Sequence, residues 1–158
     1  MLVTYESNPA TNVNKRALFI ANNMGVLHAI DPDDGTELWS YSPEELLPNI
    51  KAYVDNDPGE HVYGLDGQMV LDSSRTIEPD GTVVTDMARL YLSQRRGGNN
   101  IIALDVENAL SATNPFKVMW KISGNDAGFE ALAQTWSTPQ LINIKTGCLL
   151  YTSPSPRD

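Results

Sequence analysis

The sequence predicts an all-β fold: a partial β-propeller of about two blades, with pieces of neighbouring blades and a short helical insertion. Three observations point to it. The chain contains an internal repeat, its apolar runs are short and bounded by turn residues, and a tryptophan recurs at the same place in both copies. Repeats of short strands are typical of propeller blades, which need about 40–50 residues each.

Each copy of the repeat reads as strand, tight turn, strand, loop and strand. The strands are expected at 17–21, 26–31 and 36–41 in the first copy, and at 88–92, 100–105 and 117–122 in the second. These runs contain β-branched and aromatic residues and are bounded by Asn, Asp and Gly, as strands usually are. The inner run 101–104 is apolar on both faces, which fits a sheet packed between two others.

The two copies are offset by 74 residues, from Asp31 to Asp105, which exceeds one blade and requires insertions. We expect the first strand of the second blade at 65–71 and the start of a third blade at 136–142. The segment 73–86 predicts a hairpin-like excursion between outer strands, because Pro, Asp and Gly at its centre favour a turn.

The other insertion, 42–61, carries the helical signal. Ser42-Pro43-Glu44-Glu45 predicts a capping box with Ser42 as the N-cap residue and Pro43 at the first helical position. Pro48 prevents a long helix. One or two helical turns are therefore expected.

The last residues differ in character from the rest of the chain. Residues 148–158 form a Ser- and Pro-rich tract that cannot pair in a sheet. The tract resembles translated adapter sequence of the kind found at the ends of assembled metagenomic fragments. We expect a partial propeller domain at 1–147, incomplete at both ends, followed by a non-native tail at 148–158.

Charge and cysteine content exclude several classes of function. The net charge is −9, which argues against nucleic-acid binding, because that depends on Lys and Arg neutralising phosphates. Cys148 is the only cysteine, so the sequence has no disulfide framework and no cysteine-based metal site. No apolar run is long enough to span a bilayer.

The repeat resembles blades of the pyrroloquinoline-quinone type, which occur in enzymes, assembly lipoproteins and adhesins. The helical insertion narrows the choice. Its sequence around Trp39-Ser40-Tyr41-Ser42-Pro43 and Leu46-Leu47-Pro48-Asn49-Ile50 is similar to the segment that follows the first recognisable blade in type IV pilus tip-associated adhesins of the PilC/PilY type. Further similar segments follow in the same order at 61–67, 102–106, 114–120 and 136–139. The turn at 95–100 departs from that family because it begins with Arg95-Arg96 and is more basic than its usual Gly-rich turn.

This resemblance, over residues 17–147, implies a part of a type IV pilus adhesin and biogenesis factor, exported to the cell surface, pilus tip or outer membrane. It implies surface attachment and control of pilus assembly or retraction, with pilus components and host or abiotic surfaces as partners. It implies no enzymatic activity, and calcium only in the full-length propeller of the family. Two alternatives remain open: blades of a pyrroloquinoline-quinone-dependent dehydrogenase, or a periplasmic propeller scaffold lipoprotein.

No residue of this fragment is assigned a catalytic, cofactor-binding or metal-binding role. The sequence lacks a phosphate loop, a metalloprotease motif and a nucleophile elbow. His28 lies in an expected strand, where a packing histidine is the commoner case, and His61 is distant from it in sequence. Asp31-Pro32-Asp33-Asp34-Gly35 has the wrong spacing for a calcium loop and fits a turn capped by Asp.

Two further groups of residues show part of a binding pattern. Asp55-Asn56-Asp57-Pro58-Gly59 begins like a calcium loop that Asp66 could close, but Glu60 stands where the loop needs glycine. The tryptophans Trp39, Trp120 and Trp136 could stack on a quinone or a glycan. Recurrence at equivalent repeat positions favours packing between neighbouring sheets instead.

Overall fold

The computed structural model describes residues 1–55 and 61–142; the expected tail at 148–158 lies outside this part of the chain. The described residues contain the strands β1 (Leu2–Asn8), β2 (Val13–Ala21), β3 (Leu27–Ile30), β4 (Glu37–Tyr41), β5 (Met69–Ile77), β6 (Val83–Ser93), β7 (Asn100–Asp105) and β8 (Lys117–Ser123). The helical segments are the 3₁₀ helices η1 (Glu44–Asn49) and η2 (Arg95–Gly97) and the α-helix α1 (Ile50–Asp55). None of the described helices is long and apolar enough to cross a membrane.

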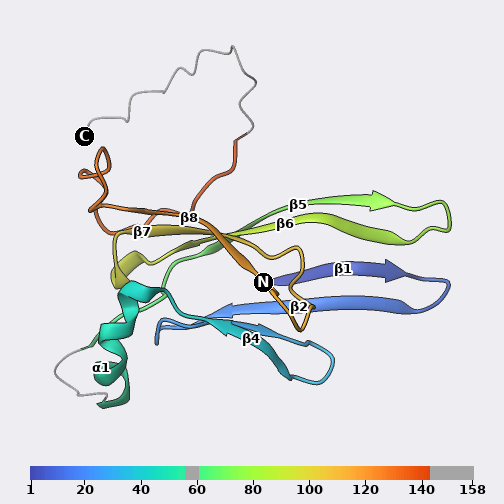
Figure 1. Cartoon of the computed structure of the whole chain (residues 1–158), viewed down its shortest axis with the longest axis horizontal. Helices are drawn as coiled ribbons and strands as arrows, with labels where there is room; N and C mark the ends of the chain where they lie inside the picture. The colour runs from blue at the N-terminus through green and yellow to red at the C-terminus, as the bar shows by residue number, and fades with distance from the viewer. Residues whose placement is uncertain (56–60, 143–158) are drawn as a thin grey trace, which may run out of the picture.

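The strands form two antiparallel units of four, β1 to β4 and β5 to β8, in which each strand pairs with the next along the chain. A short ladder between β1 and β6, with Glu6 opposite Val84 and Ser7 opposite Val83, joins the units into one folded-over sheet. Figure 1 shows the two units as separate layers that meet near the hairpin ends of β1–β2 and β5–β6. The prediction of an all-β fold with about two blades is confirmed.

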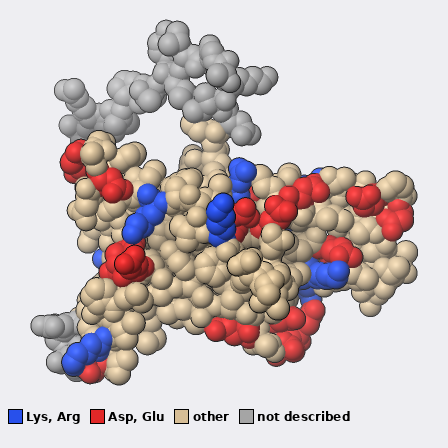
Figure 2. Space-filling model, in the orientation of Figure 1, with Lys and Arg blue, Asp and Glu red and all other residues tan. Residues whose placement is uncertain are grey.

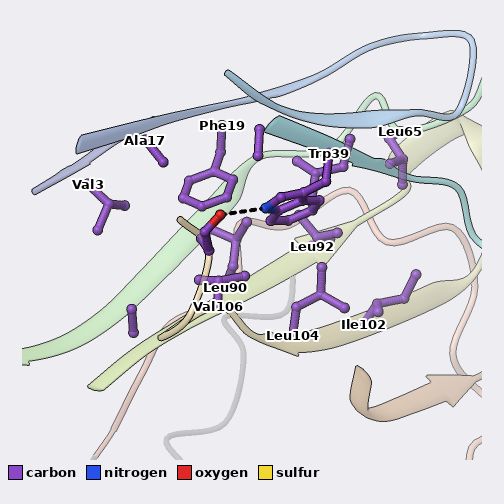
Figure 3. Close-up of a cluster of buried hydrophobic side chains, with 14 of the residues drawn as sticks. Val3, Ala17, Phe19, Trp39, Leu65, Leu90, Leu92, Ile102, Leu104 and Val106 are labelled. Carbon is purple, nitrogen blue, oxygen red and sulfur yellow. Dashed lines mark hydrogen bonds between the residues drawn. The ribbon is translucent and has the colours of Figure 1, made fainter. Parts of the chain in front are cut away.

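The hydrophobic core lies between the two units (Figure 3). The first unit contributes Val3, Ala17, Phe19, Leu27, Ala29 and Trp39, and the second contributes Ala88, Leu90, Leu92, Ile102, Leu104 and Val106. All of these side chains are buried, at 9% relative exposure or less. Burial of apolar side chains on both facing sheets is the main stabilising term here, at about 25 cal/mol per Å² of apolar surface.

The predicted internal repeat is present in the strand registers. Ala29 pairs with Trp39 in the first unit, and Ala103 pairs with Trp120 at the equivalent place in the second. Both ladders also shift register beside the paired alanine. The two units are therefore copies of one four-stranded design, of which the sequence predicted the last three strands in both copies.

Two strand predictions need correction, and one strand has no counterpart among the predictions. β1 was not predicted, although Val3 and Tyr5 are buried and alternate with more exposed neighbours. β5 begins at Met69 rather than at residue 65, because the backbone around Leu65 is bonded to the β2–β3 turn through the Asn22 carbonyl at 3.2 Å. Residues 136–142 form no strand, because none of the described strands pairs with this segment.

The predicted hairpin at 73–86 exists, but it joins the first two strands of the second unit rather than outer strands. β5 and β6 pair along their whole length up to Ile77 and Val83. Asp80 Oδ1 accepts a hydrogen bond from the Thr82 amide at 2.9 Å, and Gly81 has a φ of 85°. The turn residues therefore act as the sequence suggested.

The predicted short helix is present in the 42–61 insertion, but the capping box is wrong. Pro43 occupies the N-cap position of η1 without a side-chain capping bond. The Ser42 hydroxyl donates instead to the Gly25 carbonyl at 3.0 Å. The Glu45 side chain does not bond a backbone amide at the start of the helix, as a capping box requires. It reaches the second unit and accepts a hydrogen bond from the Asn100 side chain there.

Tyr5 is expected to make stability fall at alkaline pH. Its hydroxyl donates to the Val106 carbonyl at 2.7 Å, and burial, helped by the nearby charge of Asp105, raises the pKa of the phenol. Because the phenol ionises less readily in the folded chain, its contribution to stability is fully present below the ordinary phenol pKa of about 10. Stability falls as pH rises above that value, because the unfolded chain loses the phenol proton first.

We expect Tyr5→Phe to cost about 1 kcal/mol at pH 7 and to make the loss of stability between pH 9 and 11 shallower. Urea unfolding across this pH range measures both effects. An identical pH profile for the variant and the parent chain would contradict the assignment.

Candidate functional site at the loop end of the sheets

Several connections gather at the end of the molecule opposite the β1–β2 and β5–β6 hairpin tips (Figure 1). They are the β2–β3 turn at 22–25, the insertion with η1 and α1, η2 between β6 and β7, and the chain that follows β8. We call this set the loop end. Binding residues often lie on loops that a rigid scaffold positions, so the loop end is the candidate functional site.

Three glycines bring these loops into backbone contact. A Cβ atom on Gly64 would lie 2.2 Å from the Gly25 nitrogen, and one on Gly97 would lie 1.8 Å from the Gly64 carbonyl oxygen. No side chain fits at such distances, so only glycine allows the three loops to stack. Direct backbone contact fixes the loops relative to one another and to both strand units.

Glu45 links the helical insertion to the second unit. Its Oε1 accepts hydrogen bonds from Asn100 Nδ2 at 2.8 Å and Gln94 Nε2 at 3.2 Å, and its Oε2 lies 3.1 Å from Lys121 Nζ. Gln94 and Asn100 are buried, so a carboxylate that accepts from both amides stabilises groups that water cannot reach. The repeat did not reveal this role, because the insertion follows β4 of the first unit and no described helix follows β8 at the equivalent place in the second unit.

Replacing Glu45 with glutamine is expected to destabilise the chain by about 1–2 kcal/mol. The substitution removes the ion pair with Lys121, which is partly exposed and contributes little, and weakens two charge-assisted hydrogen bonds. Glu44→Gln, the neighbouring carboxylate in the first turn of η1, is the control and should change stability by less than about 0.5 kcal/mol. Equal losses for the two variants in urea unfolding would contradict the role of Glu45.

The most basic part of the loop end is the Arg95–Arg96 turn. The Arg95 guanidinium carbon lies 5.0 Å from the centre of the Trp136 ring, and that of Arg96 lies 5.4 Å from the same ring and 5.0 Å from the Tyr63 ring. Arg96 Nη1 also donates to the Tyr63 hydroxyl at 2.9 Å. The sequence showed the basic turn, but only the fold brings Tyr63 and Trp136 to it.

His28 borders a cavity of about 350 Å³ beside α1, lined also by Asn22, Met24, Val26, Ile50, Tyr53 and Val54. Its Nδ1 lies 2.6 Å from Glu37 Oε2, and its Nε2 lies 2.9 Å from Asn22 Nδ2. Both ring nitrogens therefore have protein partners, which agrees with the interpretation of His28 as a structural residue. His61 packs edge-on against Tyr63 instead.

The acidic candidates behave as turn residues where the structure describes them. Asp31 Oδ1 accepts from the Asp33 amide at 2.9 Å, and Asp34 Oδ1 accepts from the Thr36 amide at 2.8 Å. The bond from the Thr36 backbone lowers the pKa of Asp34. Residues 56–60 of the other calcium candidate lie outside the described part. Among the described residues no group of three or more His, Cys, Asp or Glu side chains could hold a metal ion.

The three tryptophans have different surroundings. Trp39 is buried against Phe19 and Phe116, with ring centres 5.7 and 4.6 Å away, and its Nε1 donates to the Ala109 carbonyl at 2.9 Å. Packing between sheets is thus confirmed for Trp39. Trp120 and Trp136 are 39% and 48% exposed, so neither packs between the two described strand units, and packing against a neighbouring blade stays a prediction for both. Trp120 faces away from the core. The second unit packs the face with Ile102 and Leu104 against the first unit, and Trp120 lies on its other face.

No protein-family model matches the chain. The chain is similar to a curated protein, the type IV pilus biogenesis factor PilY1 homolog of Xylella fastidiosa (strain Temecula1). The two are 26% identical over 130 residues, which are 82% of this chain and 10% of that protein. The chain thus spans about a tenth of the length of this relative. Among solved structures it is similar to the C-terminal domain of PilY1 from Pseudomonas aeruginosa, with 23% identity and a TM-score of 0.44 over 75% of this chain and 21% of that one. The predicted resemblance to PilC/PilY-type proteins is confirmed by the sequence match.

Proposed function

We propose that this chain is a two-blade segment of an exported type IV pilus biogenesis factor. The proposal is that the whole protein acts at the cell surface, at the pilus tip or outer membrane, in surface attachment and in control of pilus assembly or retraction. The observation that carries the proposal is the sequence similarity to a protein named as a pilus biogenesis factor, over most of this chain.

The arrangement of the loop end supports a binding role for this segment. Gly25, Gly64 and Gly97 hold three loops in contact, and Glu45 ties the helical insertion to the second unit. Loops fixed on packed sheets lose little conformational entropy on binding, which favours recognition of a partner. Pilus components and host or abiotic surfaces are the partners that we propose.

A role without catalysis fits the surroundings of the candidate site residues. His28 bonds Glu37 and Asn22, and the carboxylates of Asp31 and Asp34 bond turn amides. Each group therefore has a structural partner that explains its position.

A chimera tests the proposal. The similar segment of the Xylella factor is replaced by residues 1–142 of this chain, in a strain that lacks the native factor. We expect the chimera to restore surface pili, counted by electron microscopy, and twitching motility. The strain with the native segment restored and a strain with the segment deleted are the controls.

Two outcomes would overturn the proposal. One is a chimera that is exported at the level of the native factor but yields no pili. The other is quinone-dependent oxidation of an alcohol by the longer protein after loading with calcium and pyrroloquinoline quinone. Attachment counts and twitching rates, measured separately, distinguish a role in adhesion from one in retraction.

A further inference from the structure

We propose that the Arg95–Arg96 turn, together with Tyr63 and Trp136, is a binding site for a compact organic carboxylate. We call these four residues the arginine site. The proposal rests on contacts within this chain and does not depend on the pilus role.

The charges of the arginine site are unbalanced. Elsewhere in this acidic chain several cations pair with carboxylates, as Lys15 does with Glu6, Arg16 with Asp33, Lys51 with Asp55 and Lys121 with Glu45. Figure 2 shows basic side chains beside acidic ones at several places on the face drawn. Within 1–55 and 61–142, neither Arg95 nor Arg96 has a carboxylate partner. Both guanidinium carbons lie within 5.4 Å of the Trp136 ring centre, so an anion bound beside that ring would be attracted by both cations.

An unsatisfied donor marks the same place. Arg95 Nε is buried and has no hydrogen-bond acceptor among the described residues. A buried polar atom without a partner costs free energy, about 1–3 kcal/mol, and such atoms often mark functional sites. The guanidinium group carries further N–H donors in a flat fork whose geometry matches a carboxylate.

The fold holds the arginine side chains in place before any ligand arrives. Arg95 has a φ of 49°, a left-handed conformation that is unfavourable for a side chain of this kind. Thr135 stabilises this conformation, because its Oγ1 accepts from the amides of Gln94 at 3.0 Å and Arg95 at 3.2 Å. Trp136, directly after Thr135, is thereby placed against both guanidinium groups. Side chains that are already ordered lose less entropy when they bind.

The surroundings select the kind of anion. The net charge of −9 disfavours a long polyanion, which the acidic surface would repel. Trp136 keeps 48% of its surface exposed and offers an apolar ring beside the two cations. A carboxylate next to a ring or other apolar face can therefore satisfy the guanidinium groups and cover the indole together.

The test uses the whole 158-residue chain labelled with ¹⁵N. Benzoate is the main probe, acetate supplies the carboxylate alone, benzyl alcohol supplies the ring alone, and inorganic phosphate supplies a different anion. The indole N–H signal of Trp136, assigned with Trp136→Phe, and the Arg96 Nε–H signal are followed during titration. We expect saturable shifts with benzoate, weaker ones with acetate, and none with benzyl alcohol.

Arg96→Gln and Arg95→Gln should each weaken benzoate binding by about tenfold or more. Each substitution removes one of the two positive charges and one planar guanidinium group with its N–H donors. Arg75→Gln, on β5 and away from the loop end, is the matched control and should leave binding unchanged. Thermal unfolding of each variant checks that the fold is intact; a variant that unfolds is replaced by Arg96→Lys, which keeps the charge and should retain weakened binding.

Three results would overturn the proposal. They are shifts that do not saturate, equal losses for Arg75→Gln and Arg96→Gln, and phosphate that binds as tightly as benzoate. The last result would assign the site to small inorganic anions instead of carboxylates.

Discussion

Trp39→Ala is expected to destabilise the chain by about 3–5 kcal/mol, the range for removing a buried aromatic side chain. Trp39 lies between the two strand units, in contact with the rings of Phe19 and Phe116. Its removal leaves a cavity in the core and also leaves the Ala109 carbonyl without the indole N–H that now donates to it at 2.9 Å. Urea unfolding followed by circular dichroism measures the change.

Trp120→Ala is the matched control, because Trp120 occupies the equivalent position of the repeat. Its side chain is 39% exposed, and its ring centre lies 5.9 Å from that of Tyr91. We expect a loss of only about 1 kcal/mol for this variant. Similar losses at Trp39 and Trp120 would show that the core does not lie between the units as described.

Gly97→Ala is expected to destabilise the chain by about 3 kcal/mol and to separate the loops of the loop end. The added Cβ would stand 1.8 Å from the Gly64 carbonyl oxygen and 2.9 Å from that of Tyr63, so backbone on both sides has to move. The displacement should also weaken the hydrogen bond from the Leu65 amide to the Asn22 carbonyl. Hydrogen exchange at Leu65 should therefore become faster, while exchange in β2 should change little.

Gly81→Ala is the control for this substitution. Gly81 lies at the β5–β6 hairpin tip with a φ of 85°, and a Cβ there meets nothing within 4 Å. Only the left-handed backbone opposes the change, at a cost of about 1–2 kcal/mol. A Gly97→Ala variant that loses no more stability than Gly81→Ala, with unchanged exchange at Leu65, would exclude the glycine contact as a structural constraint.

Much of the fold could be predicted because its signals are local. The strands of the repeat follow from short runs of β-forming residues between Asn, Asp and Gly, and the turn at Asp33-Asp34-Gly35 forms as expected. The helical insertion is present as well. Its capping box failed because Glu45 gains three partners on the second unit, more than an N-terminal amide could offer.

The candidate site was less predictable, because it consists of residues far apart in sequence. The basic character of Arg95 and Arg96 is visible in the sequence, but their contacts with Tyr63 and Trp136 cross between separate loops. The glycine contact has the same origin. Gly25, Gly64 and Gly97 look like ordinary turn glycines until the packing of two strand units brings their backbones together.

The sequence by itself determined the all-β class, the repeat and the resemblance to pilus factors, because strand and turn preferences and residue order are properties of the linear chain. The tertiary structure decided which copy of a repeated residue is buried. Trp39 and Trp120 have the same local sequence setting, yet one lies in the core and the other on the surface. Two stacked copies present unlike faces to each other, so burial depends on which face meets a neighbour, and no local pattern records that.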